Sequence, residues 1–210
     1  MYLSKLVLNE RDRKVRSDLS NAHNLHRSIM QAFPDENREN SRADWNILFR
    51  QEPDSEVILV QSDAEIEPDW ARLPQGYLVQ HAVKSFDVQA SQIKSSQLFQ
   101  FRLKANPSKR DKASGKLIAM FHQSDQREWL ERKGKQCGFS VNGINIIPTP
   151  NIFGFKAKGN SPIKIFAVLY QGILEVEDPN LLIESIRQGI GRGRSYGCGL
   201  LSIARVLRFQ

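Results

Sequence analysis

The pattern of apolar and polar residues in the first half of the chain predicts short strands and two helices. Leu3–Leu8 has the character of a strand, and apolar residues then recur at helical spacing from Ser17 to Phe33, with Leu25 and Ile29 on the apolar face. Pro34 cannot continue this helix and closes it. Further elements are expected as strands at 45–50, 57–61 and 77–81 and a short helix within 63–73. This β-α-β-β-α-β order is that of a ferredoxin-like, or RRM-like, domain.

The second half of the chain repeats this order with an insertion. Leu98–Leu103 alternates like a strand, Ser124–Gln136 has a helical pattern, and another helix begins at Pro179. Strand-rich segments are expected at 139–147, 163–176 and 200–207. We therefore expect an α+β fold of two tandem ferredoxin-like domains, residues 1–88 and residues 96–210, joined by a stretch rich in Ser and Gln.

The formal net charge of +7 favours a polyanionic partner. The positive charge is concentrated in the second half, because the segment Asp35–Arg72 is strongly acidic whereas residues 101–116 and 184–210 are basic. Charge alone does not distinguish a nucleic acid from a membrane surface.

Two features bear on the cellular compartment. Cys137 and Cys198 form no CxxC pair, so a disulfide framework is not expected. No stretch reaches the roughly 18 apolar residues of a membrane span, and the N-terminal residues lack the apolar core of a signal peptide. We expect a cytoplasmic protein without a membrane partner.

A glycine-rich segment, GIGRGRSYGCG at 189–199, separates the last predicted helix from the last predicted strand. Successive backbone N–H groups in such a loop can bind a phosphate, arginines add positive charge, and a tyrosine can stack on a base. The alternative is a helix C-cap and a turn with solvated arginines. The order of the flanking elements excludes a Walker A loop. The candidate binding residues are Gly189, Gly191, Arg192, Gly193, Arg194, Ser195 and Tyr196.

Four separated segments resemble the CasE/Cse3 family of CRISPR repeat-processing endoribonucleases. They are MYLSKLVLN at 1–9, LHRSI at 25–29, FRLKANPSKR at 101–110 and QGIGRGRSYGCGLLSIA at 188–204. The resemblance spans the chain and is weakest between Asp35 and Leu73. It implies two ferredoxin-like domains, and it implies a CRISPR repeat RNA stem-loop and other Cascade subunits as partners. It also implies that the protein stays bound to its cleaved RNA.

The resemblance further implies RNA cleavage without a metal ion or another cofactor. The ribose 2′-hydroxyl attacks the adjacent phosphorus and leaves a 2′,3′-cyclic phosphate and a 5′-hydroxyl. This reaction needs proton transfer at both reacting oxygens and stabilisation of the phosphorane. His26 matches the family's catalytic histidine and is expected to act as general acid or base. His23 could complete an acid–base pair or orient a phosphate, and Arg27 could stabilise the phosphorane or face solvent.

The helix that carries these residues has other interpretations. By its pattern alone it is an amphipathic helix with histidines at the border of the apolar face. Two histidines three residues apart could bind a metal, but no Asp, Glu or Cys cluster completes such a site. The family commonly has a tyrosine at the position of His23, which leaves the roles of the two histidines open. A non-catalytic RNA hairpin-binding protein is therefore the main alternative, and a metal-dependent nuclease is a third.

A basic run follows the first strand of the second domain and surrounds a Ser114–Gly115 turn. It predicts an exposed hairpin or loop, and a solvated charged loop without a function is the alternative. The family resemblance makes it the element that grips the RNA stem. Because A-form RNA hides its base edges in a deep, narrow groove, we expect phosphate contacts and a steep salt dependence of binding. The residues are Lys104, Lys109, Arg110, Lys112 and Lys116.

Overall fold

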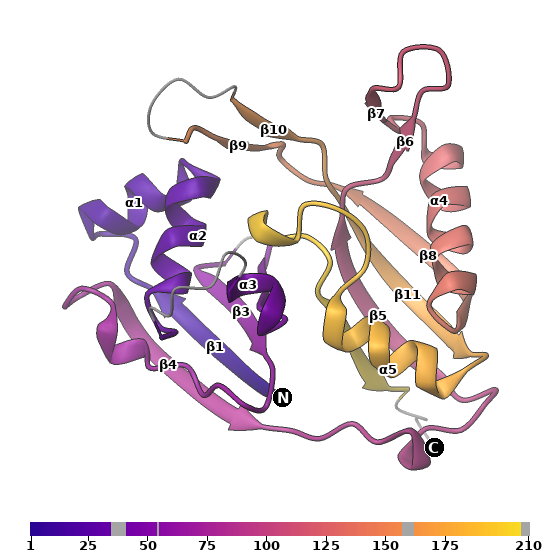
Figure 1. Ribbon diagram of the computed structural model, residues 1–210, viewed down its shortest axis with the longest axis horizontal. Coiled ribbons are helices and arrows are strands. Elements are labelled where there is room, and N and C mark those ends of the chain that lie inside the picture. Colours follow the sequence, from indigo (N-terminus) through magenta and orange to yellow (C-terminus); the bar gives the residue numbers. More distant parts are fainter. Residues whose placement is uncertain (35–40, 54, 157–161, 207–210) are drawn as a thin grey trace. The chain divides into compact units, whose positions relative to one another are not determined.

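The computed structural model describes residues 1–34, 41–53, 55–156 and 162–206, which form two compact units (Figure 1). The first unit consists of Met1–Asp87, Asn151–Ile165 and Arg194–Gly197, and the second of Val88–Pro150, Phe166–Gly193 and Cys198–Gln210. Residues 151–165 and 194–197, which the sequence pattern groups with the second domain, thus pack with the first unit. None of the described helices combines the length and apolar character that crossing a membrane requires.

The first unit is built on a four-stranded antiparallel sheet with the order β2-β3-β1-β4. In the register, Leu6 lies opposite Ile58 on one side and His81 on the other. This order, with helices between the first two strands, confirms the ferredoxin-like prediction. The strands are β1 (Tyr2–Leu8), β2 (Leu48–Gln51), β3 (Val57–Ser62) and β4 (Leu78–Ser85).

The helix predicted from Ser17 to Phe33 is two helices, so the prediction of one helix was wrong. The first, α1 (Arg13–Leu19), ends at Ser20, and the second, α2 (Ala22–Met30), begins after Asn21, whose backbone is extended. Ser and Asn side chains favour helix ends because they bond to nearby backbone groups. The apolar spacing continues across this break and therefore did not reveal it.

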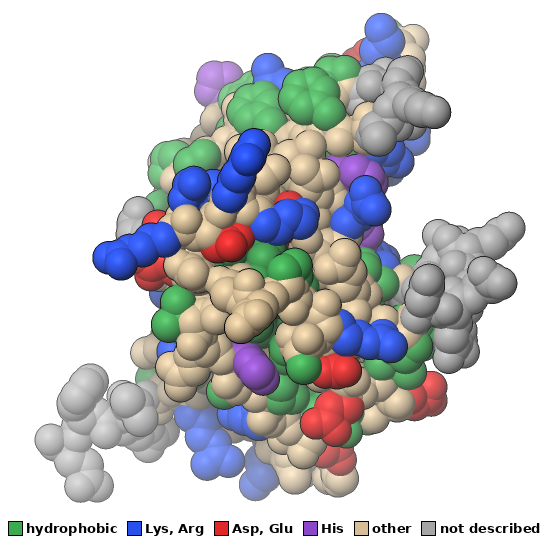
Figure 2. Space-filling view, turned by 90° about the vertical axis from the view of Figure 1, so that its left-hand side faces the viewer, with side chains coloured by type: hydrophobic (Ala, Val, Ile, Leu, Met, Phe, Trp, Pro, Cys, Tyr) green, Lys and Arg blue, Asp and Glu red, His purple; other side chains and the backbone are tan. Residues whose placement is uncertain are grey.

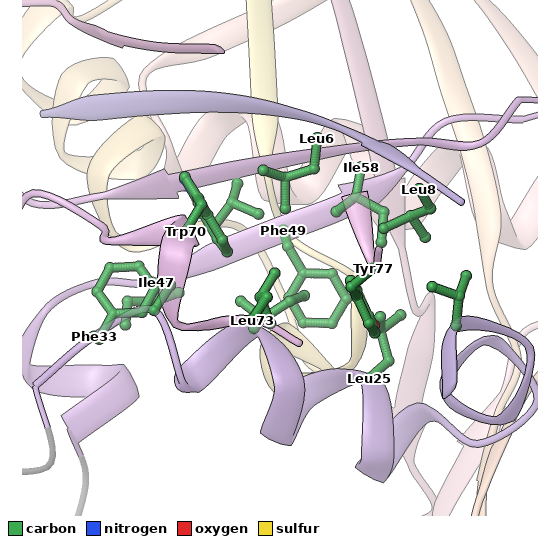
Figure 3. Close-up of a cluster of buried hydrophobic side chains, with 14 of the residues drawn as sticks. Leu6, Leu8, Leu25, Phe33, Ile47, Phe49, Ile58, Trp70, Leu73 and Tyr77 are labelled. Atoms are coloured by element: carbon green, nitrogen blue, oxygen red, sulfur yellow. The ribbon is translucent and has the colours of Figure 1, made fainter. Parts of the chain in front are cut away.

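The apolar core of the first unit lies between its sheet and its helices (Figure 3). Leu6 and Ile58 enter it from the sheet and Leu25 enters it from α2. The short helix expected at 63–73 is reduced to the 3₁₀ turn η1 (Trp70–Arg72). The indole of Trp70 is buried and donates a hydrogen bond to Ser4 Oγ at 3.0 Å. A further short helix, α3 (Ser41–Asp44), precedes β2.

A buried carboxylate ties α1 to α2. Asp18 accepts hydrogen bonds from Ser28 Oγ at 2.6 Å and from the Tyr77 hydroxyl at 2.9 Å, and it pairs with the Lys14 ammonium at 2.5 Å. Burial, followed by the Asp18 charge, raises the pKa of the Tyr77 hydroxyl well above its usual value, so this hydroxyl remains a donor. Because Ser28 belongs to α2, the network fixes the helix that carries the candidate histidines.

The second unit repeats the strand order as β12-β5-β11-β8, which confirms the second ferredoxin-like prediction. Trp129 stacks on Tyr170 with ring centroids 6.0 Å apart and packs a helix onto the sheet. The strands are β5 (Leu98–Ala105), β8 (Phe139–Pro148), β11 (Val168–Val176) and β12 (Leu201–Arg205). The helices are α4 (Gln123–Gln136) and α5 (Pro179–Gln188), and the 3₁₀ turn η2 (Ala90–Gln92) precedes β5.

Two short antiparallel hairpins are added to this plan. In the second unit β6 (Ser108–Arg110) pairs with β7 (Leu117–Ala119), and in the first unit β9 (Ile152–Gly154) pairs with β10 (Ile163–Ile165). The strand-rich segment predicted at 163–176 is therefore divided between β10 in one unit and β11 in the other. The 3₁₀ turn η3 (Arg194–Tyr196), within the glycine-rich segment, belongs to the first unit.

Candidate active site

Helix α2 carries the candidate side chains His23, His26 and Arg27. The start of the helix is fixed by Asn21, whose Oδ1 accepts a hydrogen bond from the backbone N–H of His23 at 3.1 Å. Leu25 is buried in the core, the two histidines are half-buried at its border, and Arg27 is exposed. The histidines are three residues apart and therefore lie on the same side of the helix.

The ring of His26 lies against the ring of Tyr196, with centroids 6.2 Å apart and planes inclined at 67°. Tyr196 belongs to η3, which packs against both α2 and β2. Gly197 makes this packing possible because its φ is +85° and an added Cβ would lie 3.2 Å from the ring of Phe49. Burial raises the pKa of the Tyr196 hydroxyl, which keeps it protonated.

Positive charge borders His26. Burial is the largest cause that lowers the pKa of His26, and the charges of Arg42, His23 and Lys156 add to it, so the pKa falls to about 4. The imidazole is then uncharged at neutral pH and can accept a proton. Burial and the charge of Arg194 also lower the pKa of Arg42. We call Arg42, Lys156 and Arg194 the cationic cluster. Like charges gathered in this way favour an anionic ligand.

The hairpin β9–β10 presents Lys156, and Asn21 holds the hairpin. Asn21 Oδ1 accepts a hydrogen bond from the backbone N–H of Phe155 at 3.0 Å, and its Nδ2 donates to the Phe155 carbonyl at 3.3 Å. The close approach favours glycine at position 154, because a Cβ there would lie 2.9 Å from Asn21 Oδ1 and 3.1 Å from the backbone nitrogen of His23, and a larger residue would force a shift. One residue thus starts α2 and fixes the strand that leads to Lys156.

His23 is the second imidazole of the site. Burial, Arg27 and Lys156 lower its pKa, in that order of effect. Its Nδ1 is buried and has no hydrogen-bond partner among the described residues. A buried polar atom without a partner is rare, and a ligand group or ordered water commonly satisfies it. In the part of the chain that the structure describes, no group of three or more His, Cys, Asp or Glu side chains could hold a metal ion.

The basic run at 104–116 is divided between a strand and a hairpin of the second unit. Lys104 is half-buried on β5, outside the hairpin. The carboxylate of Asp111 closes the hairpin turn by accepting hydrogen bonds from the backbone N–H and the hydroxyl of Ser114, at 2.8 and 2.6 Å. The exposed basic residues of the hairpin are Lys109, Arg110, Lys112 and Lys116.

The glycine-rich segment is shared between the two units. Gly189, Gly191, Arg192 and Gly193 belong to the second unit, and Arg194, Ser195 and Tyr196 belong to the first. Gly191 has a φ of +83°, and an added Cβ would lie 3.1 Å from the ring of Trp129. At positions 191 and 197 a positive φ and close packing against an aromatic ring therefore favour glycine, a reason that the interpretation as a phosphate-binding loop did not include.

The structure brings together four of the predicted residues, His23, His26, Arg194 and Tyr196, in the first unit. The sequence interpretation missed Arg42 and Lys156. Arg42 lies in the acidic segment Asp35–Arg72, whose net charge conceals it, and Lys156 belongs to no motif. Both are recognised only through the packing of α2 with its neighbours.

The whole chain is similar to CRISPR-associated proteins. A family described as CRISPR associated protein matches residues 1–205. The CRISPR-associated endoribonuclease Cse3 of Thermus thermophilus is 34% identical over 221 residues, covering 97% of this chain and 100% of that protein. The Cascade subunit CasE of Escherichia coli is 29% identical, covering 97% of this chain and 99% of that protein.

A solved structure supports the same relationship. The structure of the CRISPR endoribonuclease Cse3 bound to a 19-nucleotide RNA has a TM-score of 0.84 and 36% identity to this chain. The match covers 97% of this chain and 100% of the solved chain. This protein belongs to the CasE/Cse3 family of CRISPR-associated proteins.

Proposed function

We propose that this protein is a metal-independent endoribonuclease that binds CRISPR repeat stem-loops and cleaves precursor RNA into mature guide RNAs. The observation that carries the proposal is the half-buried His26, whose pKa is about 4 and which lies beside Tyr196 and the cationic cluster. The names of its relatives, an endoribonuclease and a Cascade subunit, support the substrate class and assembly with other Cascade subunits. The protein then stays bound to its product within Cascade.

The proposed reaction is attack by a ribose 2′-hydroxyl on the adjacent phosphorus. The bond between O2′ and phosphorus forms while the bond between phosphorus and O5′ breaks, which gives a 2′,3′-cyclic phosphate and a 5′-hydroxyl. His26 is uncharged at neutral pH and suits removal of the proton from the 2′-oxygen. His23, on the same side of α2, is the second proton-transfer group. A bound phosphate raises the pKa of both imidazoles and allows one of them to donate a proton to O5′.

The cationic cluster is the group that stabilises the negative charge developing on the phosphorane. Positive groups held in place before the reaction stabilise the charge that develops in the transition state. Arg27 is a further candidate for this role. Its side chain is exposed, but its charge, after burial, lowers the pKa of His23.

The stem of the RNA is held mainly by its phosphates. The proposed RNA-binding residues of this chain are the exposed lysine and arginine residues of the β6–β7 hairpin, Lys104, and the glycine-rich segment 189–196. Each phosphate contact releases counterions, so binding should weaken steeply as salt is added.

Incubation with the host's repeat RNA in the presence of a chelator tests the proposal. We expect cleavage of unmodified RNA and no cleavage when the scissile nucleotide is 2′-deoxy. RNA that is bound but not cut would favour the non-catalytic stem-loop-binding protein. A metal-dependent nuclease would be favoured if a chelator abolishes cleavage and the RNA with a 2′-deoxy nucleotide at the scissile position is still cut.

A further inference from the structure

One face of the β9–β10 hairpin is aromatic and exposed. Phe153 retains 49% and Phe155 retains 63% of its accessible surface. Side chains alternate along a strand, so these two residues share one face and Gly154 belongs to the other. Figure 2 shows one side of the molecule, on which several hydrophobic side chains (green) are exposed and some have lysine or arginine side chains (blue) beside them.

The opposite face of the hairpin is closed against α2, which explains why the phenylalanines point outward. A Cβ at Gly154 would lie 2.9 Å from Asn21 Oδ1 and 3.1 Å from the backbone nitrogen of His23. No side chain larger than glycine fits there without a shift. The aromatic rings therefore have no place beneath the hairpin, and burial in the core does not account for them.

The aromatic face is held close to the proposed catalytic residues. Two hydrogen bonds join the backbone of Phe155 to the side chain of Asn21, which in turn caps the helix at His23. The next residue along the chain is Lys156, whose charge lowers the pKa of both histidines. Phe155 is thus positioned by the same contacts that position the proton-transfer groups.

The charge around the rings indicates the kind of ligand. Lys164 pairs with Phe153 across the hairpin, and its ammonium lies 5.9 Å from the centroid of that ring. Lys156 follows Phe155 and is exposed. Aromatic rings among lysines form the surface that binds unpaired nucleotides, because the bases stack on the rings and the phosphates pair with the ammonium groups.

We propose that Phe153 and Phe155 form a stacking site for an unpaired nucleobase of the RNA next to the scissile phosphate. The site holds the strand that enters or leaves the paired stem, so that the 2′-hydroxyl and the phosphorus are aligned at His26. This inference rests on the proposed function and adds to it the contact that selects an unpaired nucleotide beside the cut.

The test combines three substitutions of Phe155 with RNAs that lack one base. Phe155→Tyr keeps the ring, Phe155→Leu keeps an apolar side chain without a ring, and Phe155→Ala removes both. Each protein is assayed on unmodified repeat RNA and on RNAs with a ribose-containing abasic nucleotide at each unpaired position flanking the cut. Because stacking is worth a factor on the order of 5 to 150 per base, kcat/KM should fall by that factor in the Leu and Ala variants and stay near wild type in the Tyr variant.

The abasic RNAs identify the stacked base. At one position the abasic RNA should slow the wild-type protein by the same factor, and Phe155→Ala should then cause no additional loss. The inference is overturned if the Leu and Ala variants cut unmodified RNA as fast as wild type. It is also overturned if their loss persists on every abasic RNA.

Binding of an uncleavable 2′-deoxy RNA separates this inference from the proposed function. The same ratios between variants should appear in the dissociation constants, where no chemistry occurs. A wild-type protein that binds but never cuts contradicts the proposed reaction and leaves the stacking site testable. Equal dissociation constants for wild type, Phe155→Leu and Phe155→Ala contradict the stacking site alone.

Discussion

The two ferredoxin-like units have the same strand order and differ in what is added to it. In the first unit η1 replaces a full helix, and two elements from late in the sequence are added: β9 packs against α2, and η3 packs against α2 and β2. In the second unit α4 and α5 are both complete, and the added β6–β7 hairpin is exposed.

This difference shows how one fold supports two tasks, because the function of a site depends on what is added to the shared scaffold. The first unit places charges around a half-buried imidazole and changes its pKa. The second unit presents its hairpin charges to water, where they attract a polyanion but do not create an acid or a base. We therefore expect the first unit to cleave the RNA and the second to hold its stem. The first two predictions below test that division, and the other two test how the first unit positions and tunes His26.

The largest expected effect is that of His26→Ala. Loss of a positioned proton-transfer group should slow single-turnover cleavage by about 10² to 10⁴-fold, while RNA affinity changes little. Single-turnover rates and equilibrium binding of repeat RNA measure the two quantities. His81→Ala, an exposed histidine on β4 of the same unit, is the control and should cleave normally. Equal losses in the two variants would contradict the role of His26.

Removing the positive charges of the β6–β7 hairpin should have the opposite effect to His26→Ala, because it should weaken RNA binding and leave the cleavage rate nearly unchanged. Replacing Lys109, Arg110, Lys112 and Lys116 with glutamine should weaken binding, and the salt slope of log K should become shallower by about 0.7 to 0.9 for each phosphate that is no longer neutralised. Cleavage of saturated RNA should stay near the wild-type rate. Lys94→Gln with Lys135→Gln, exposed lysines elsewhere in the second unit, is the control. If the hairpin variant binds normally but cuts slowly, the division of tasks is wrong.

Lys156→Gln should have a smaller effect on the rate and a characteristic effect on its pH dependence. Lys156 lowers the pKa of His26, so its removal should raise that pKa from about 4. The acid limb of kcat/KM should then move to higher pH, because His26 is a base only when uncharged. NMR titration of the free protein measures the pKa directly. Lys164→Gln, on the same hairpin, should leave it unchanged, and an unchanged His26 pKa in the Lys156 variant would exclude this coupling.

The smallest expected effect separates the two roles of Asn21. Serine keeps the helix cap, so Asn21→Ser should cost little stability, whereas Asn21→Ala should lower the free energy of unfolding by about 1 kcal/mol. Serine is too short to pair with the backbone of Phe155, so the Ser variant should still cut more slowly than wild type. Urea denaturation and single-turnover cleavage provide the two measurements. A Ser variant that is both stable and fully active would show that the hairpin does not depend on Asn21.

The fold was largely predictable from local patterns, and the errors of that prediction have one cause. Alternating and helical spacings gave both β-α-β-β-α-β orders, because these spacings reflect which residues face a core. The same spacing hid the break at Ser20–Asn21 and gave no sign that 163–176 divides between two units. Capping and the choice of sheet depend on contacts that a periodic pattern does not contain.

The candidate site was predictable only in part. The family resemblance pointed to His26 and to the glycine-rich segment, and the structure adds that Tyr196 contacts the His26 ring. Arg42 and Lys156 could not be found by counting charge, because the first lies in an acidic segment and the second follows a short strand that joins the other unit. Their effect on His26 depends on distance in space.

The sequence by itself determined the β-α-β-β-α-β order of the two units, the family, the basic character of the second half and a helical segment that carries the histidines. The family follows from the resemblance of four separated motifs, and the other features follow from composition and from spacing along the chain. The tertiary structure alone decided that β9 and η3 pack against α2, and that burial and nearby positive charges lower the pKa of His26 to about 4. The physical reason is that a pKa is set by burial and by charges that are near in space, and folding brings those charges together from distant parts of the sequence.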